Sequence, residues 1–164
     1  MGIFQITLIL ATLLCSLAAG LLFTFAIVVM PGIRSLDNRA FIRAFQVTDR
    51  IIQNNQPLFM LVWLGSVVTL LIAAVLGFGQ LDTAGRLLII SATLIYLLGV
   101  QLPTITINIP LNNELQTLDV DVMDEASNSA ARQAFEPRWN RWNAIRTAFA
   151  VLACLLLMTL LLIL

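Results

Sequence analysis

Residues 57–78 read PLFMLVWLGSVVTLLIAAVLGF and contain no charged side chain. This stretch lies in one of four long windows without Asp, Glu, Lys or Arg, and the others are residues 1–33, 87–113 and 147–164. A helix needs about 20 mostly apolar residues to cross the hydrocarbon core of a bilayer, where a charged side chain is costly. Three windows are long enough unaided, and the last becomes so once the Trp-rich residues before it are included. The sequence therefore predicts an all-α membrane protein, a bundle of four transmembrane helices.

The composition of the chain supports a membrane location. Hydrophobic residues make up 60% and charged residues 11% of its 164 residues, whereas soluble domains carry about 25% charged residues. The net charge is zero, which gives no indication of a nucleic-acid partner. Four spans leave little length for a separate soluble part. We therefore predict a single integral membrane domain over residues 1–164, with the lipid bilayer as its partner.

The predicted spans are residues 6–30, 57–78, 86–109 and 137–164. We interpret the first as a retained helix rather than a signal peptide, because it lacks a basic n-region and its apolar run is long. Pro137 is predicted to begin the last span, because proline is favoured at the first position of a helix.

The arginines predict the orientation of the spans. Eight of the nine lie in or beside the loops 31–56 and 110–137, and Arg86 alone lies in the turn at the opposite face. The positive-inside rule then places both loops in the cytoplasm and both termini outside, in the cell inner or plasma membrane. Arginines that serve a binding site would produce the same bias, and the sequence leaves that alternative open.

The first of these loops has the pattern of an amphipathic helix. On a helical wheel, a polar stripe of Arg39, Arg43, Gln46 and Arg50 lies opposite an apolar group of Phe41, Phe45 and Ile52. We expect a cytoplasmic amphipathic helix between spans one and two, with its apolar face in the headgroup zone or on the bundle. It is either a surface helix that touches anionic lipid or a lid over a membrane-facing pocket.

Polar residues gather at the predicted cytoplasmic ends of the third and fourth spans. The candidate site residues there are Asn108, Asn112, Trp139, Trp142, Asn143 and Arg146. The two on the third span lie one helical turn apart, and on the fourth span Trp139, Asn143 and Arg146 share one face. If the two faces meet, their carboxamides, guanidinium and indole line a single cavity at the membrane boundary.

Each of these residues also has a structural interpretation. Tryptophan is common in interfacial belts, arginine extends its charged end towards water, and asparagine bonds between helices in lipid. The combination exceeds what anchoring alone needs. The chain has no His, and Cys15 and Cys154 are far apart without a paired-thiol motif, so we expect no metal site and no redox centre of paired thiols.

Three segments in order along the chain carry a resemblance to a known family. They are residues 25–32 (FAIVVMPG), 108–115 (NIPLNNEL) and 139–147 (WNRWNAIRT). Together they resemble the integral membrane family called domain of unknown function 1772, or anthrone oxygenase-like, over about residues 7–157. The resemblance implies a four-span bundle and, in some members, oxygenation of polyketide anthrones to anthraquinones without metal or flavin.

The chemistry that this resemblance implies suits a membrane. An anthrone is a flat, apolar carbon acid, and loss of one proton gives an enolate that reacts with O2 directly, so that no cofactor is required. Under the resemblance Arg146 stabilises the enolate oxygen, and Asn112 and Asn143 orient the carbonyl.

The remaining candidates are assigned to ligand contact and proton transfer. Trp139 or Trp142 packs on the aromatic ring, and Asn108 belongs to the same ligand-binding set. Glu114 is the nearest candidate base, and pairing with an arginine of the last span is the alternative for this acid. The absence of His leaves no obvious neutral base.

A non-catalytic function explains the sequence equally well. A membrane subunit, or a protein that binds lipid or a small molecule, needs the same packing, aromatic belt and basic helix. Polar residues around a cavity would favour a small apolar aromatic ligand, whereas Asn pairs between helices without a cavity would favour a structural role.

Overall fold

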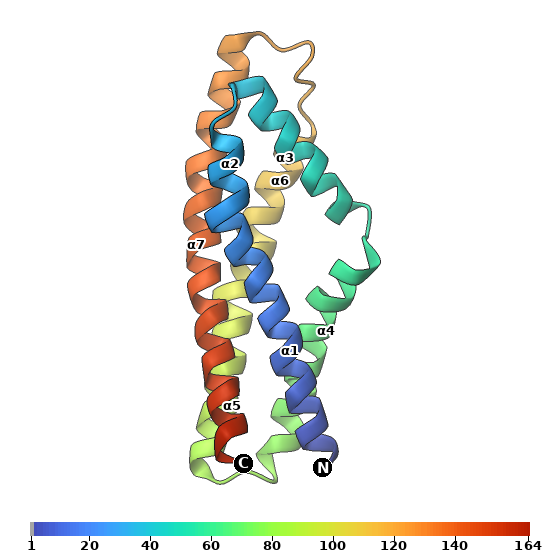
Figure 1. Cartoon of the computed structure of the whole chain (residues 1–164), viewed down its shortest axis with the longest axis vertical. Helices are drawn as coiled ribbons and strands as arrows, with labels where there is room; N and C mark the ends of the chain where they lie inside the picture. The colour runs from blue at the N-terminus through green and yellow to red at the C-terminus, as the bar shows by residue number, and fades with distance from the viewer. Residues whose placement is uncertain (1) are drawn as a thin grey trace.

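The computed structural model describes residues 2–164, and within that range it contains helices and turns but no strand (Figure 1). Four helical rods are long and apolar enough to cross a membrane, namely Ile3–Arg34, Pro57–Phe78, Thr83–Gln116 and Glu125–Ile163. The predicted all-α bundle of four spans is confirmed by the length and composition of these rods.

The first rod consists of α1 (Ile3–Thr24), the π-helical segment η1 (Phe25–Val29) and α2 (Met30–Arg34). It is longer than the predicted span because the helix continues past Pro31. In η1 the helix widens, and the Met30 N–H donates to the carbonyl of Phe25, five residues earlier. The wider turn leaves room for the pyrrolidine ring of Pro31, which in a regular α-helix would clash with the backbone carbonyl four residues earlier.

The third rod contains two more π-helical segments, each followed by a proline. It runs through α5 (Thr83–Tyr96), the π-helical segments η2 (Leu97–Gln101) and η3 (Thr104–Asn108), and α6 (Ile109–Gln116). Pro103 and Pro110 each follow a π-helical segment by two residues, as Pro31 does. The rod begins at Thr83 because Asp82 caps it, accepting a hydrogen bond from the Gly85 N–H.

The last rod is the single helix α7 (Glu125–Ile163). The prediction that it begins at Pro137 is wrong, because the helix begins twelve residues earlier, at Glu125, where Asp124 caps it and accepts a hydrogen bond from the Ser127 N–H. Pro137 lies in the helix interior and is exposed. The helical turns before it are held by packing and by the ion pair between Arg132 and Glu136.

The predicted amphipathic helix exists as α3 (Asn38–Gln53), and its apolar face lies on the bundle rather than in the headgroup zone. Phe41 and Phe45 are buried against Phe135 of α7. The prediction for Gln46 is wrong: this residue is buried, because its side-chain amide donates to the backbone carbonyls of Leu115 and Leu118.

The turn after α3 leads into α4 (Pro57–Phe78), and the two helices form an elbow that stands out from the other rods (Figure 1). Asn55, in this turn, has a φ of 57°, a left-handed conformation that asparagine tolerates better than most residues.

Packing is close between α1 and α4, between α1 and α7, and between α5 and α7. Both termini lie at one end of the bundle and α3 lies at the other. Which end faces the cytoplasm stays a prediction.

Two apolar clusters fill the bundle. One lies towards the termini and includes Leu8, Leu70 and Leu157, whereas the other lies under α3 and includes Phe41 and Leu111. The level between them is occupied by polar side chains, and the candidate site lies there.

Candidate functional site

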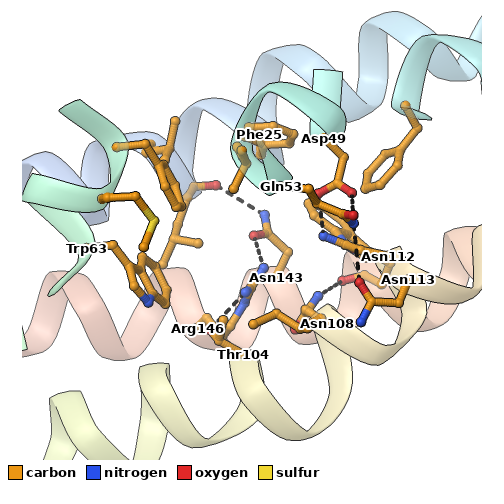
Figure 2. Close-up of a pocket in the computed structure, with 18 of the residues that line it drawn as sticks. Phe25, Asp49, Gln53, Trp63, Thr104, Asn108, Asn112, Asn113, Asn143 and Arg146 are labelled. Atoms are coloured by element: carbon orange, nitrogen blue, oxygen red, sulfur yellow. Dashed lines mark hydrogen bonds between the residues drawn. The ribbon is translucent and has the colours of Figure 1, made fainter. Parts of the chain in front are cut away.

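A cavity of about 390 Å³ lies at the level between the two apolar clusters. Its walls come from α1 and η1, α3, α4, η3 and α6, and α7, so that residues far apart in the sequence meet around one space (Figure 2). The predicted site residues that line it are Asn108, Asn112, Trp139, Asn143 and Arg146. Its volume falls within the range of about 300–1,000 Å³ that is usual for small-molecule sites.

Arg146 of α7 is buried, with 4% of its surface exposed. One terminal nitrogen donates to the hydroxyl of Thr104 over 2.9 Å, and the other donates to Oδ1 of Asn143 over 2.9 Å. Its Nε has no hydrogen-bond partner among the described residues, and no ion pair of the described residues includes this guanidinium. The guanidinium carbon lies 5.7 Å from the centre of the Trp139 ring, an arrangement that favours a cation–π interaction. A buried charge without an acidic partner is rare in a protein.

Two asparagines flank this guanidinium from different elements. Asn143 accepts a hydrogen bond from Arg146 and donates one to the backbone carbonyl of Leu22 over 3.1 Å, so its side chain connects α7 with α1. Asn108 is 1% exposed, and its amide donates to the carbonyl of Trp139 over 3.5 Å. The Oδ1 atom of Asn108 has no partner among the described residues. An unpaired buried acceptor costs free energy, so this oxygen is suited to receive a hydrogen bond from a ligand.

A second polar cluster surrounds Asp49 of α3. This carboxylate accepts from Asn112 over 2.8 Å at Oδ1, and from Gln53 over 2.7 Å and Gln116 over 3.1 Å at Oδ2. Asn112 in turn accepts a hydrogen bond of 2.8 Å from the indole N–H of Trp139. Burial raises the pKa of the Asp49 carboxyl above its ordinary value, and the hydrogen bonds from Gln116, Gln53 and Asn112 oppose that shift.

Asp49 was not recognised in the sequence, although a signal was present. It lies four residues after Phe45 and three before Ile52, so a helical wheel places this acid on the apolar face of α3. An acid on the face that packs against the bundle is a candidate for a functional site, because isolated buried carboxylates are costly.

The two other predicted residues do not line the cavity. Glu114 is exposed and lines a second, smaller pocket of about 240 Å³ together with Arg138. It lies two residues after Asn112, so the helix turns it to the other side of α6. The expectation that Glu114 is the nearest acid is therefore wrong, since Asp49 lines the cavity itself. Trp142 is half-buried and does not line the cavity, although Asn143 directly after it does.

Another part of the cavity lining is apolar and was missed in the sequence. It comes from Phe25 of η1 and from Phe59, Met60 and Trp63 of α4. The rings of Phe59 and Trp63 are stacked, with centroids 5.9 Å apart and planes inclined by 9°. These residues sit in charge-free windows, where an apolar side chain that faces a cavity has the same pattern as one that faces lipid.

The fold and the site together define a membrane-spanning helical bundle with a ligand-sized cavity that is lined by both aromatic and polar side chains. A family model described as anthrone oxygenase matches residues 55–156, which is more than half of the chain. The chain belongs to the anthrone oxygenase family, so the family that its sequence resembles is confirmed. Segments 108–115 and 139–147 lie within the matched range, and segment 25–32 lies outside it. No curated protein matches the chain, and no solved structure matches it. The matched range begins after α3, so Asp49 lies outside it.

Proposed function

We propose that the cavity binds a flat, apolar aromatic carbon acid of the anthrone class and that the protein catalyses its oxygenation by O2 without a cofactor. The observation that carries this proposal is Arg146, a buried guanidinium with no acidic partner among the described residues and an unpaired Nε, beside an aromatic-lined cavity. Such a group favours a ligand oxygen that gains negative charge during the reaction.

The ligand class follows from the walls of the cavity. The aromatic side chains of Phe25, Phe59 and Trp63 suit a flat ring system, and the volume suits a ligand of a few fused rings. A hydroxyl on that ring system donates to the free Oδ1 of Asn108. An apolar ligand of this kind partitions into the bilayer, where the protein itself resides.

The reaction balances without any further redox partner. Removal of one proton from the carbon opposite the carbonyl gives an aromatic enolate. The enolate transfers an electron to O2, and the two radicals combine to a peroxide at that carbon. Loss of the second hydrogen of the same carbon as a proton, with cleavage of the O–O bond, leaves a second carbonyl. One oxygen atom enters the quinone and the other leaves as water.

Within this reaction each polar residue has a definite role. Arg146 stabilises the enolate oxygen, and Asn143 holds the guanidinium in place from its Oδ1 atom. Asn112 has both ends of its carboxamide engaged, by Trp139 and by Asp49, so it positions those two residues rather than the carbonyl.

Replacing Arg146 with Leu tests the proposal. The protein in lipid nanodiscs is given an anthrone, and O2 uptake and quinone absorbance are recorded above the spontaneous rate. We expect turnover to fall by about 100-fold or more, the usual effect of removing one group that stabilises an oxyanion. Leu at this position also removes a buried charge that lacks an acidic partner, so the variant is expected to fold.

The matched control is Arg141→Leu, on the same helix but exposed and outside the cavity. It should leave turnover unchanged. Equal rates in wild type and the Arg146 variant would exclude the assignment of that residue and the oxygenase mechanism built on it.

A second candidate function is non-catalytic binding. The bonds from Asn143 to Leu22 and from Asn108 to Trp139 join different helices, which is what a purely structural use of asparagine requires. Saturable binding of an anthrone by calorimetry, without O2 uptake above background, would support this function over the oxygenase.

A further inference from the structure

Two charged side chains line the cavity, Asp49 and Arg146, and no ion pair joins them. They come from different regions of the chain, the first from the amphipathic helix α3 and the second from the last span α7. Asp49 is 4% exposed, and it has no cationic partner among the described residues. Proteins rarely bury a carboxylate in this way without a functional reason.

The carboxylate is held in one orientation by neutral donors. Three carboxamides donate to it, and each is itself fixed by a further contact: Asn112 by Trp139, Gln116 by the carbonyl of Gln46, and Gln53 by Asn113. These hydrogen bonds lower the basicity of the carboxylate, but burial outweighs them and raises the pKa of Asp49. No guanidinium pairs with this carboxylate to lower the pKa further.

The carboxylate also retains capacity for a proton. An ionised carboxylate offers about four acceptor positions, and the protein uses one at Oδ1 and two at Oδ2. Oδ1 is therefore the oxygen with more free capacity beside the cavity. It is bonded to Asn112, which links the acid to the Trp139 indole on the cavity wall.

We propose that Asp49 is the general base of this cavity, taking the proton from the acidic carbon of the substrate while Arg146 holds the enolate oxygen. This inference rests on the proposed function and adds a catalytic residue from outside the range that matches the family. It also gives α3 a function, because this helix carries the base into the bundle from the loop between the first two spans.

The protons balance through this single residue. The ionised Asp49 takes the first C–H proton, and the enolate combines with O2 to give a peroxide anion. The protonated Asp49 returns that proton to the outer peroxide oxygen. It then takes the second C–H proton as the C–H electrons form the carbonyl and the O–O bond breaks. The released hydroxide takes that proton and leaves as water.

The titration of Asp49 is expected to dominate the pH dependence of proton transfer. Glu114 of α6 faces the second pocket rather than this one. The other charged groups on α3 and on the elements packed against it are Arg39, Arg43 and Arg50 on α3, Arg34 on α2, and Glu125, Arg132, Glu136, Arg138, Arg141 and Arg146 on α7. Of these, Arg146 is the one that lines the cavity.

Hydrogen exchange at the acidic carbon tests the base separately from oxygenation. The full chain in nanodiscs is incubated without O2 with an anthrone deuterated at that carbon, and loss of deuterium to water is followed by mass spectrometry above the buffer rate. Wild type should accelerate the exchange, and Asp49→Asn should lose about 100-fold or more of that acceleration, as expected for removal of a general base. Anthrone affinity of this variant, measured by calorimetry, should change little.

Two further variants separate a catalytic role from a structural one. Glu114→Gln removes the acid that lies outside the cavity and should exchange like wild type. Asp49→Ala should be inactive but regain exchange when formate is added, because a small carboxylate can enter the vacated space. In wild type the exchange rate should fall as the pH drops through a pKa above the usual range for Asp, because only the ionised carboxylate accepts a proton.

The outcomes distinguish this inference from the proposed function. If wild type oxygenates anthrone and Asp49→Asn exchanges as fast as wild type, the base is wrong and the oxygenase stands. If wild type exchanges in an Asp49-dependent way but consumes no O2, the base stands and oxygenation is wrong. A wild-type exchange rate that does not fall at acid pH would contradict the role of Asp49 as the base, even without a variant. A wild type that accelerates neither hydrogen exchange nor O2 uptake would contradict both the base and the oxygenase.

Discussion

The half of the bundle near the termini differs from the half under α3 in its helices as well as in its side chains. The terminal half, residues 3–22, 65–78, 83–96 and 150–163, is regular α-helix around a continuous apolar cluster. The cavity half, residues 25–60, 97–116 and 125–147, contains the three π-helical segments of the described chain. Each of them ends two residues before a proline.

This contrast connects backbone irregularity with chemistry. The regular helices of the terminal half pack closely through small and apolar residues, and the buried hydroxyls of Ser66 and Tyr96 there satisfy each other in a hydrogen bond of 2.8 Å. A π-helical turn is wider and redirects the side chains that follow it. Thr104 and Asn108, the first and last residues of η3, both line the cavity. The prolines therefore help to create the space that the polar residues occupy.

The largest expected effect concerns the stability of the terminal half. Leu157 is fully buried there, and its replacement by Ala should lower the free energy of unfolding by about 2–5 kcal/mol, because lost packing contacts leave a void. Unfolding in mixed micelles, followed by circular dichroism, measures this change. The folded fraction should still bind anthrone with normal affinity.

Leu162, which is exposed on the same helix, provides the control. Its replacement by Ala should change the free energy of unfolding by less than about 0.5 kcal/mol. Loss of anthrone binding by folded Leu157→Ala protein would show that the two halves are not independent.

An intermediate effect is expected from Pro110→Ala in the cavity half. Alanine restores an N–H that can donate to the carbonyl four residues earlier, so η3 relaxes towards a regular α-helix and Asn108 rotates. We expect anthrone affinity to fall about tenfold, which corresponds to about 1.4 kcal/mol, while thermal stability is kept or raised. Calorimetric titration and thermal unfolding measure the two quantities.

Pro137 offers a matched comparison, because it lies inside α7 without a preceding π-helical segment. Pro137→Ala should leave anthrone affinity unchanged. Equal affinities in both proline variants would show that the π-helical segments are incidental to the cavity.

The smallest effect concerns Trp139 and Trp142, the two tryptophans that the sequence offered as alternatives for packing on the ligand ring. Trp139→Phe keeps an aromatic ring but loses the donor to Asn112, so kcat/KM for anthrone oxygenation should fall about 2- to 10-fold, the usual result of one lost hydrogen bond. Trp142→Phe should leave kcat/KM unchanged, since Trp142 lies outside the cavity. Equal effects of the two substitutions would contradict this division.

The spans and most of one site wall were predictable from the sequence. A long window without charge predicts a transmembrane helix, because a helix satisfies its own backbone hydrogen bonds in lipid. Asn143 and Arg146 were identified because polar residues at the edge of an apolar window are unusual. The start of α7 was predicted wrongly because the sequence around Pro137 does not distinguish a proline at the first position of a helix from one at an exposed position inside a helix.

The rest of the site depended on how α3 packs. Gln46 was assigned to the polar stripe of α3, because the backbone carbonyls of Leu115 and Leu118 that bury its amide are not visible in the sequence. Asp49 lies on the apolar face of the helical wheel, but the carboxamide of Asn112 that holds it comes from α6. Phe59 and Trp63 of α4 carried no signal at all, because the bend of the elbow decides whether they face lipid or the cavity.

The cavity is lined by one acid and one guanidinium, and this balance affects the electrostatic cost of the reaction in the low dielectric of a bilayer. With Asp49 ionised, Arg146 protonated and a neutral ligand bound, the formal charge of the site is zero. After the proposed proton transfer the acid is neutral and the enolate carries the negative charge, so the total is still zero. Charge moves across the cavity without changing its sum. An electroneutral step of this kind avoids most of the solvation penalty that creating a net charge inside a membrane would impose.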